Sequence, residues 1–380
     1  MSNALNNIET NALPVKQPPL KKTPLNAVHR ALGGKMVDFA GYDMPVEYSG
    51  VMSEHKAVRQ QAGIFDVSHM GEIEVSGPQA LALVQHVTIN DASKLVDGQA
   101  QYSALLYEHG GFVDDILVHR VNAESYFLCV NASNQDKDFQ HIHDHNLVGA
   151  KVENAGPRYS QIAVQGPLAT GIVQKLTALD LSSIKRYHFA DGKVAGVDSR
   201  CARTGYTGED GWELYVANDA AVPVWQKLME AGKDVGLVPC GLGARNTLRL
   251  EAAMPLYGHE IDASINAWEA GLDWVVKLHK GDFVGRDALL SAREQGVKRK
   301  LIGFEMTERG IARDGCEIVV DGTGVGWVTS GGPSPSTNKI IGMCYLPVEI
   351  AVPEKNIEIS VRGRSVAAVT VALPFYKRAK

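Results

Sequence analysis

Short segments in which apolar and polar residues alternate recur along the chain before residue 298 and predict β-strands. These segments are residues 71–75, 112–118, 125–130, 161–164 and 213–216. Apolar residues recur at helical spacing in residues 78–87, 168–176, 222–231 and 246–254. Because these strands and helices do not alternate regularly, the pattern favours an α+β fold over a parallel sheet built from βαβ units.

The pattern changes near residue 298, where β-rich segments separated by Gly and Pro turns begin. These segments are residues 300–305, 317–320, 324–329, 340–345 and 357–361. A helical pattern at residues 287–295 precedes them. The sequence therefore predicts a separate C-terminal all-β domain with a helix leading into it.

Charge and composition narrow the class of protein. The chain has 38 basic and 43 acidic residues, a net charge of −5, with no basic block, which argues against nucleic acid as a partner. No apolar run approaches the roughly 18 residues of a membrane span. The five cysteines are widely spaced and form no Cys-x-x-Cys pair, which suits a reducing compartment and argues against a cysteine-built metal site. Residues 1–22 are polar and contain no secretion signal, so we expect a flexible N-terminal arm on a cytoplasmic protein.

Residues 203–214 are the most polar glycine-rich segment of the chain. Three glycines alternate there with Arg203, Tyr206, Glu209, Asp210 and Glu213, and a strand pattern follows. Glycines let the backbone turn tightly and approach a ligand, and a loop ending in a strand can present side chains to a small molecule. An ordinary hairpin turn would also explain the glycines alone.

Two consecutive acids, Asp114 and Asp115, lie at the start of the strand predicted at residues 112–118. Successive side chains on a strand point to opposite faces, so one of the two is expected to point inward. A buried carboxylate is unfavourable unless it is hydrogen-bonded or functional. A pair of acids that caps a turn is the alternative explanation.

Residues 241–252 predict a glycine-rich turn that leads into a helix. Arg245 lies near the start of that helix, where its positive charge opposes the helix dipole unless an anion meets it. A helix N-terminus with an arginine suits an anionic ligand group, although pairing with a structural acid is an equal alternative. The glycine spacing matches neither nucleotide-binding fingerprint.

Two other clusters are weaker candidates. Asp66, Ser68 and His69 offer the side chains of a nucleophilic triad, but close neighbours on one strand cannot converge on one point. We expect a structural or pocket-lining role for them. The His-x-His-x-His run at residues 141–145 invites a metal site, but a helix there would direct the three rings around its axis, so no metal is expected.

Taken together, these segments resemble the T-protein family of the glycine cleavage system, the tetrahydrofolate-dependent aminomethyltransferases. The resemblance extends from Thr23 to about Tyr376. The matching segments, in family order, are residues 35–41, 65–72, 110–118, 162–167, 203–214, 241–252, 256–260, 274–277 and 282–285.

The resemblance implies a three-domain cloverleaf around a central channel that holds the folate. It implies one domain from residues 23–66 with 156–255, a second from residues 67–155 with 256–278, and a β-rich domain at residues 279–380. It also implies no metal, no flavin and no covalent intermediate on the enzyme.

The resemblance assigns a catalytic role to Asp115 and folate contacts to Tyr102, Tyr206, Glu213, Arg245 and, with a less certain alignment, Tyr376. The side-chain chemistry agrees with these roles. A carboxylate such as Glu213 can accept both parallel N–H donors of a pterin ring, and tyrosines provide flat walls with a polar tip. A buried Asp115 could take the proton that a folate nitrogen releases as it forms a C–N bond.

The sequence departs from the family pattern at two places. Asn246 replaces the usual Asp after the site arginine, so a local Arg–Asp contact is expected to be missing. The segment at residues 329–335 is shifted from the usual Ser-Gly-x-x-Ser-Pro spacing, which affects loop detail.

Two other functions on the same fold compete with aminomethyl transfer. A folate-dependent demethylase or methyltransferase acting on a free small molecule would use the same folate residues. A folate-binding protein that assists iron–sulfur assembly would need a cysteine that is absent from residues 280–286.

The family's partner is lipoylated H-protein, which carries the aminomethyl group on its dihydrolipoyl arm. Because H-proteins are generally acidic, the expected docking surface is basic, although a solvated basic face is an equal explanation of such a run. The candidates are Lys277, Lys280, Arg286, Arg293, Lys298, Arg299 and Lys300.

Overall fold

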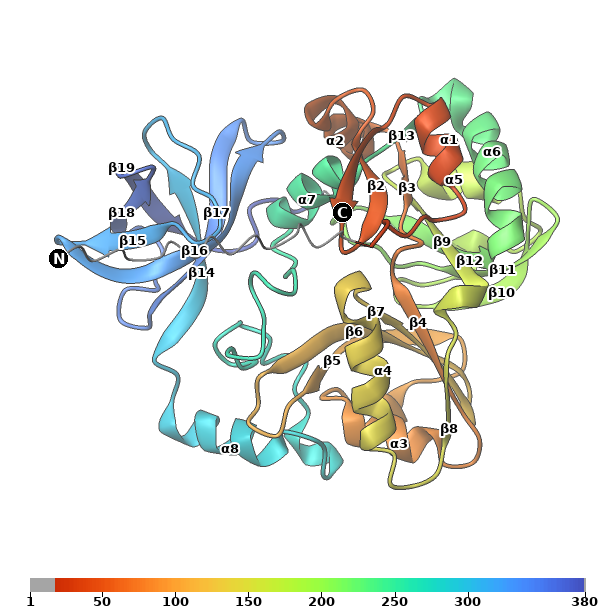
Figure 1. The fold of residues 1–380 in the computed structure, drawn as a ribbon, viewed down its shortest axis with the longest axis horizontal. Coiled ribbons are helices and arrows are strands. Elements are labelled where there is room, and N and C mark those ends of the chain that lie inside the picture. The colour runs from red at the N-terminus through yellow and green to blue at the C-terminus, as the bar shows by residue number, and fades with distance from the viewer. Residues whose placement is uncertain (1–17, 379–380) are drawn as a thin grey trace, which may run out of the picture.

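The structure, a computed structural model, describes residues 18–378 and divides them into three lobes around a centre (Figure 1). The predicted N-terminal arm therefore lies largely outside the described residues. Within its described end, the Lys21 backbone pairs with Gly41 and Asp43. The α+β fold class with a C-terminal barrel is confirmed. The predicted domain boundaries and the cytoplasmic location remain predictions.

The first lobe is a six-stranded sheet in the order β10-β11-β12-β9-β3-β13, antiparallel except where β13 pairs with β3. Its strands are β3 (Gly63–Asp66), β9 (Tyr159–Gln165), β10 (Phe189–Val194), β11 (Val197–Ala202), β12 (Gly211–Ala217) and β13 (Val238–Pro239). The helices of this lobe are α1 (Asn26–Ala31), α2 (Val51–Gln60), α5 (Ala169–Gln174), α6 (Ala221–Gly232) and α7 (Leu242–Glu251). A separate hairpin comprises β1 (Lys35–Phe39) and β2 (Tyr42–Glu47).

The second lobe is a five-stranded antiparallel sheet in the order β5-β6-β7-β4-β8. Its strands are β4 (Gly71–Ser76), β5 (Gln99–Leu106), β6 (Phe112–Asn122), β7 (Ser125–Val130) and β8 (Lys151–Asn154). Helices α3 (Ala80–Val87) and α4 (Gln135–Asp144) lie beside this sheet (Figure 1).

The third lobe is a closed six-stranded barrel in the order β14-β17-β16-β15-β18-β19. Its strands are β14 (Arg299–Met306), β15 (Glu317–Val320), β16 (Thr323–Ser334), β17 (Lys339–Pro347), β18 (Asn356–Val361) and β19 (Arg364–Val371). Helix α8 (Arg286–Gln295) leads into the barrel, as the sequence predicts.

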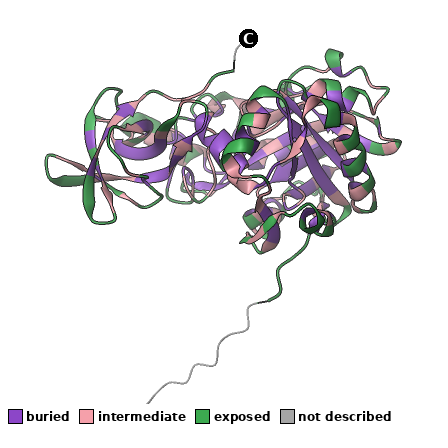
Figure 2. Cartoon of the chain, turned by 90° about the horizontal axis from the view of Figure 1, so that it is seen from above, coloured by how far each residue is buried: buried purple, intermediate pink, exposed green. Residues whose placement is uncertain are grey.

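Burial follows the sheets. Figure 2 shows the buried residues concentrated on the strands and on the inner sides of the helices. The core of the first lobe includes Trp212 on β12 and Trp225 on α6, both essentially inaccessible to solvent. Within residues 18–378, no helix is long and apolar enough to cross a membrane.

Helix α7 begins at Leu242, four residues before the apolar spacing at residues 246–254 and within the glycine-rich turn expected to lead into it. The reason is close packing at the glycines, which the apolar spacing does not reveal. A Cβ at Gly243 would lie 2.5 Å from the side chain of Val51, and one at Gly241 would lie 2.3 Å from the backbone of Val46. The glycines therefore bring the first turn of α7 against α2 and β2.

Candidate functional site

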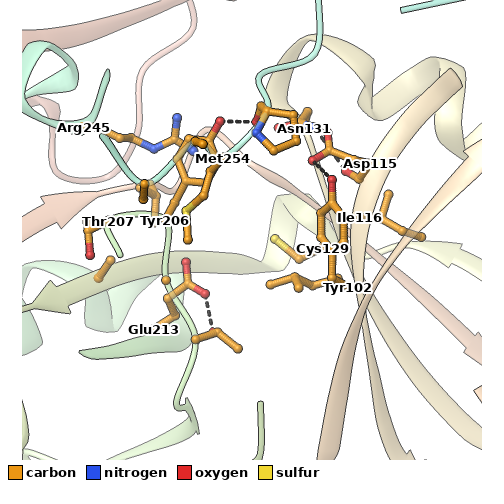
Figure 3. Close-up of a pocket in the computed structure, with 18 of the residues that line it drawn as sticks. Tyr102, Asp115, Ile116, Cys129, Asn131, Tyr206, Thr207, Glu213, Arg245 and Met254 are labelled. Atoms are coloured by element: carbon orange, nitrogen blue, oxygen red, sulfur yellow. Dashed lines mark hydrogen bonds between the residues drawn. The ribbon is translucent and has the colours of Figure 1, made fainter. Parts of the chain in front are cut away.

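A cavity of about 560 Å³ lies where the three lobes meet, which is a usual size for a small-molecule site. All three lobes contribute to its lining, for example Phe65 from the first, Ile116 from the second and Leu301 from the third. Five of the six residues expected to form the site line it, namely Tyr102, Asp115, Tyr206, Glu213 and Arg245. Figure 3 shows Asp115 and Tyr102 on one side of the pocket and Arg245 with Tyr206 on the other.

Strand β6 places Asp115 at the pocket. Ala104 of β5 pairs with Asp115, so Tyr102, two residues away on β5, points to the same face. The Tyr102 hydroxyl donates to Asp115 Oδ2 at 3.0 Å, and Asn131 Nδ2 donates to Oδ1 at 2.8 Å. The carboxyl is thus held by one donor on each oxygen.

The preceding residue, Asp114, points to the opposite face of β6 and is fully buried. The expected alternation of the two acids is therefore confirmed. Burial and the neighbouring Asp114 carboxylate together raise the pKa of Asp115 to about 7, while the hydrogen bonds from Tyr102 and Asn131 oppose that rise. A carboxyl with a pKa near neutrality can both accept and release a proton under physiological conditions.

Glu213 lies on β12, between Ala202 of β11 and Ala163 of β9, two small residues that leave room above its carboxyl. Gln161 Nε2 donates to its Oε1 at 3.0 Å, and the Thr204 hydroxyl donates to its Oε2. Each carboxylate oxygen has about two acceptor positions, so each retains one for a ligand. Burial raises the pKa of Glu213, and Thr204 and Arg245 oppose that rise.

Arg245 lies in the first turn of α7, as expected, with its guanidinium 4.4 Å above the ring of Tyr206. Its side chain forms no hydrogen bond or ion pair with any of residues 18–378. Burial lowers the pKa of Arg245, and the nearby Glu213 opposes that effect. The Tyr206 hydroxyl donates to the Pro255 carbonyl, which fixes the ring. The structure thus leaves a positive charge available inside the pocket.

Tyr376 does not line the cavity. Its ring lies 3.9 Å from the Arg59 guanidinium, and its backbone N–H donates to the Glu251 carbonyl at 2.8 Å. Neighbouring residues Leu373 and Pro374 do line the cavity. Any contact between Tyr376 and a ligand would therefore occur at the edge of the pocket.

Asn246 makes a local contact with an arginine, but with Arg249 and not with the site arginine Arg245. Its Oδ1 accepts from Arg249 Nε at 2.9 Å, because an amide oxygen serves as acceptor where a carboxylate would. Arg249 also pairs with Glu260 at 2.8 Å and donates to Ser330 Oγ at 2.7 Å. Ser330 belongs to the shifted segment 329–335, which thus contacts α7 despite its altered spacing.

The structure adds residues that the sequence analysis did not assign to the site. Asn131, just after β7, bonds both Asp114 and Asp115. Trp274 stacks on Tyr102, with ring centroids 5.9 Å apart and planes 19° apart, while its side chain remains largely exposed. The segment Trp274–Lys277 matches the family, but nothing in its pattern indicated an aromatic stack at the cavity.

The discounted clusters form no reactive group. Asp66 accepts from Thr23 at 2.6 Å and from His29 at 2.8 Å, which is a structural arrangement. The ring nitrogens of His69 are buried and bond to no other described residue, so Asp66, Ser68 and His69 do not converge. Across residues 18–378, no group of three or more His, Cys, Asp or Glu side chains is placed to hold a metal ion.

Comparison with known proteins agrees with this architecture. The model of the GCVT N-terminal domain matches residues 25–280, and that of the glycine cleavage T-protein C-terminal barrel domain matches residues 299–377. Aminomethyltransferases from Acidobacterium capsulatum and Koribacter versatilis are 52% and 50% identical to this chain, each over 95% of it and 97% of their own length. The crystal structure of glycine cleavage system aminomethyltransferase T from Bartonella henselae superposes with a TM-score of 0.89 at 32% identity, covering 94% of this chain and 98% of that one.

Three lobes, a terminal barrel and a polar pocket between them define an α+β transferase of the T-protein fold. The chain belongs to the glycine cleavage T-protein family, the aminomethyltransferases.

Proposed function

We propose that this chain transfers the methylene carbon of the aminomethyl group on the dihydrolipoyl arm of H-protein to tetrahydrofolate. The products are 5,10-methylenetetrahydrofolate, ammonia and reduced lipoyl H-protein. The observation that carries the proposal is the pocket itself. It places a carboxyl with a pKa of about 7 opposite a guanidinium that pairs with no described residue, in a chain of the aminomethyltransferase family.

The lining suits a pterin with an acidic tail. Glu213 has one free acceptor position on each oxygen, which fits the two parallel N–H donors of a pterin edge. Tyr102 and Tyr206 offer flat surfaces, and Arg245 offers a charge for an anionic or carbonyl group. Tyr376 would contribute only at the edge of the pocket, through its position on Arg59.

Asp115 is the residue proposed to move a proton. A folate nitrogen bonds to the methylene carbon as the bond from that carbon to the dihydrolipoyl sulfur breaks, which leaves the nitrogen cationic and the sulfur as a thiolate. The Asp115 carboxylate accepts the proton that this nitrogen then loses, and ammonia leaves when the second folate nitrogen bonds to the same carbon. Tyr102 and Asn131 hold one oxygen each, so the orientation of the carboxyl is set before the substrate arrives.

The competing function, a demethylase or methyltransferase acting on a free small molecule, is the less well supported one. Relatives near 50% identity that align over 95% of this chain are named aminomethyltransferase. The deciding experiment compares turnover of aminomethyl-loaded H-protein with turnover of free methyl donors, each with tetrahydrofolate. Turnover of the free donors alone would overturn the proposal.

The rate should depend on pH through Asp115. Because burial and Asp114 raise the pKa of Asp115 to about 7, its basic form is lost as the pH falls below that value. We expect kcat/KM to decrease about tenfold per pH unit on the acid side of pH 7. The Asp114→Asn variant removes one cause of the raised pKa, so its acid limb should move to lower pH. A pH–rate profile of the two proteins measures this shift, and coincident acid limbs would contradict it.

The predicted basic docking surface needs correction at four of its seven residues. Lys277 Nζ donates to the Trp274 carbonyl at 2.5 Å, and Arg286 Nε donates to the Leu278 carbonyl at 3.3 Å. Lys280 is not free, because its Nζ donates to the Gln85 carbonyl at 2.6 Å and to the Thr88 carbonyl at the end of α3. Arg299 is engaged by Glu269 at 2.9 Å. Charged side chains that already bond to groups of their own chain are poorly suited to attracting another protein. Arg293, Lys298 and Lys300 remain exposed.

We expect the triple change Arg293→Glu, Lys298→Glu and Lys300→Glu to raise the KM for H-protein about tenfold or more at low salt. The wild-type KM should itself rise with salt, because exposed charges are screened beyond about 8–10 Å at physiological ionic strength. Arg362→Glu, in the exposed turn between β18 and β19, is the matched control and should leave KM unchanged. A KM that is insensitive to both salt and the triple change would place docking elsewhere.

A further inference from the structure

The carboxylate behind the pocket, Asp114, has one acceptor position left over. It is fully buried between β6 and α4. Its Oδ1 accepts from Asn131 Nδ2 at 2.9 Å and Asn134 Nδ2 at 2.7 Å, and its Oδ2 accepts from the Asn131 backbone at 2.9 Å. An ionised carboxylate has about four acceptor positions, so three donors leave one unfilled.

Asp138, in the first turn of α4, lies beside Asp114. Its side chain is fully buried, and its carboxyl lies within hydrogen-bonding range of Asp114. Among residues 18–378, no N–H or hydroxyl donor reaches either of its oxygens. Two carboxylates this close would repel each other strongly away from water, whereas one proton between them makes a hydrogen bond.

The nearest cation does not neutralise Asp138. Lys137 precedes it on α4, but its Nζ donates to the Val113 carbonyl at 2.5 Å and to the Tyr257 hydroxyl at 2.9 Å. In the described part of the chain, no lysine, arginine or histidine lies within 4.0 Å of the Asp138 carboxyl as an ion pair. The Lys137 ammonium group is therefore directed to Val113, near the start of β6, and to Tyr257.

We propose that Asp138 is a positioning residue that carries a proton at neutral pH and donates it in a hydrogen bond to Asp114. Asp114 then has four donors and keeps its negative charge beside Asp115. Asn131 links Asp114 to Asp115, since its Nδ2 lies 2.9 Å from Asp114 Oδ1 and 2.8 Å from Asp115 Oδ1. The pair of Asp138 and Asp114 thus fixes the charge of Asp114 and the position of Asn131, which holds the Asp115 carboxyl.

The electrostatic surroundings agree with a protonated Asp138. Burial and the Asp114 carboxylate raise the pKa of Asp138 to about 11, with a smaller contribution of the same sign from Asp115 and an opposing one from Lys137. Tyr257, from the segment between α7 and α8, also lies near this pair, because Asp114 and Asp138 both contribute to raising its pKa. Of the charged groups that act on Asp138, Lys137 favours its ionisation, whereas Asp114 and Asp115 oppose it.

Stability as a function of pH tests the proton directly, without any assay of catalysis. A carboxyl with a raised pKa in the folded state stabilises the fold fully only below its unfolded pKa, near 4, and this contribution is lost as the pH rises. Asp138→Asn keeps a neutral donor and cannot titrate. We therefore expect the unfolding equilibrium constant of wild type, relative to that of Asp138→Asn, to rise up to about tenfold per pH unit from pH 5 to 9. Urea unfolding at several pH values measures this ratio.

Asp136→Asn is the matched control, because Asp136 is exposed in the same first turn of α4. Its ratio to wild type should stay flat from pH 5 to 9. A flat ratio for Asp138→Asn as well would overturn the proposal, since an ionised Asp138 takes up no extra proton on folding. The second expected observation is an infrared carbonyl band of a protonated acid in the difference spectrum of wild type minus Asp138→Asn at pH 8. The difference is needed because burial also raises the pKa of Glu72, whose own band would cancel.

The catalytic consequence rests on the proposed role of Asp115. Asp138→Asn replaces one neutral donor by another, so the acid limb of the pH–rate profile should not move. Asp138→Leu keeps the volume but donates nothing, so its turnover should be lower than that of Asp138→Asn. An ionised Asp138 would instead give a limb that moves to lower pH in Asp138→Asn, because a negative charge near Asp115 is removed. The pH dependence of the unfolding equilibrium constant is expected even if Asp115 is not catalytic. Failure of the proposal for Asp138 can therefore be distinguished from failure of the proposed role of Asp115.

Discussion

Asp115→Asn should reduce turnover of aminomethyl-loaded H-protein by about 10²–10⁴-fold, the usual contribution of a general base. Asparagine keeps the shape and can still meet Tyr102 and Asn131, but it lacks the charge and the basic lone pair that accept a proton. Because the substitution changes one carboxyl group and leaves both of its donors in place, the fold and tetrahydrofolate affinity should remain close to those of wild type. Single-turnover kinetics together with a folate titration measure both quantities.

Asp114→Asn is the appropriate comparison, since Asp114 is the adjacent acid on the opposite face of β6 and does not line the cavity. Its turnover at pH 8, per folded molecule, should fall much less than that of Asp115→Asn. Near-normal turnover by Asp115→Asn would remove this residue from catalysis. A loss of folate affinity equal to the loss of turnover would make it a binding residue instead.

The alternation of side chains allowed much of this site to be anticipated. The strand pattern at residues 112–118 put Asp114 and Asp115 on opposite faces, and the structure has Asp114 buried and Asp115 at the pocket. The glycine-rich turn before Arg245 predicted a charge near a helix N-terminus, and the guanidinium indeed has no partner among the described residues. Both inferences rest on local periodicity, which a sequence displays directly.

Contacts between distant segments could not be anticipated in this way. Arg59 joins Glu209, at 2.8 Å, to Glu251, also at 2.8 Å, across 192 positions of sequence in the second case. Gln161 and Glu213 meet only because β9 pairs with β12. No spacing in the chain indicates which strands become neighbours, so the hydrogen bonds that orient Glu213 depend on the fold.

The surroundings of charged residues also could not be predicted from the sequence. Lys280 and Arg299 lie in a basic run that suggested an exposed docking surface, yet both bond to the protein itself. Desolvation lowers the pKa of Lys280 to about 7, which reflects how far its ammonium group is withdrawn from water. A run of like charges in the sequence does not tell which members remain in solvent.

Glu213→Ala and Arg245→Ala should each weaken tetrahydrofolate binding by a factor of about 5 to 150, corresponding to about 1–3 kcal/mol for a ligand polar group left unpaired. Glu213 would lose the two acceptor positions not used by Gln161 and Thr204. Arg245→Ala would remove a charge that forms no ion pair with any described residue. Calorimetric titration with tetrahydrofolate measures the dissociation constants, and single-turnover rates at saturating folate should change less than these constants.

Conservative replacements at Glu213 and Arg245 should differ in how much folate affinity they restore. Glu213→Gln keeps one acceptor but places an N–H₂ group against a donor of the ligand, so it should restore little affinity. Arg245→Lys keeps the charge but loses the planar fork that lies 4.4 Å over Tyr206, so it should restore part of the affinity. Glu230→Ala, on the exposed side of α6 where Glu230 pairs with Lys227, should leave binding unchanged. Unchanged folate dissociation constants for both alanine variants would place the pterin elsewhere in the cavity, because a buried carboxylate and an unpaired guanidinium cannot contact a ligand without contributing to its affinity.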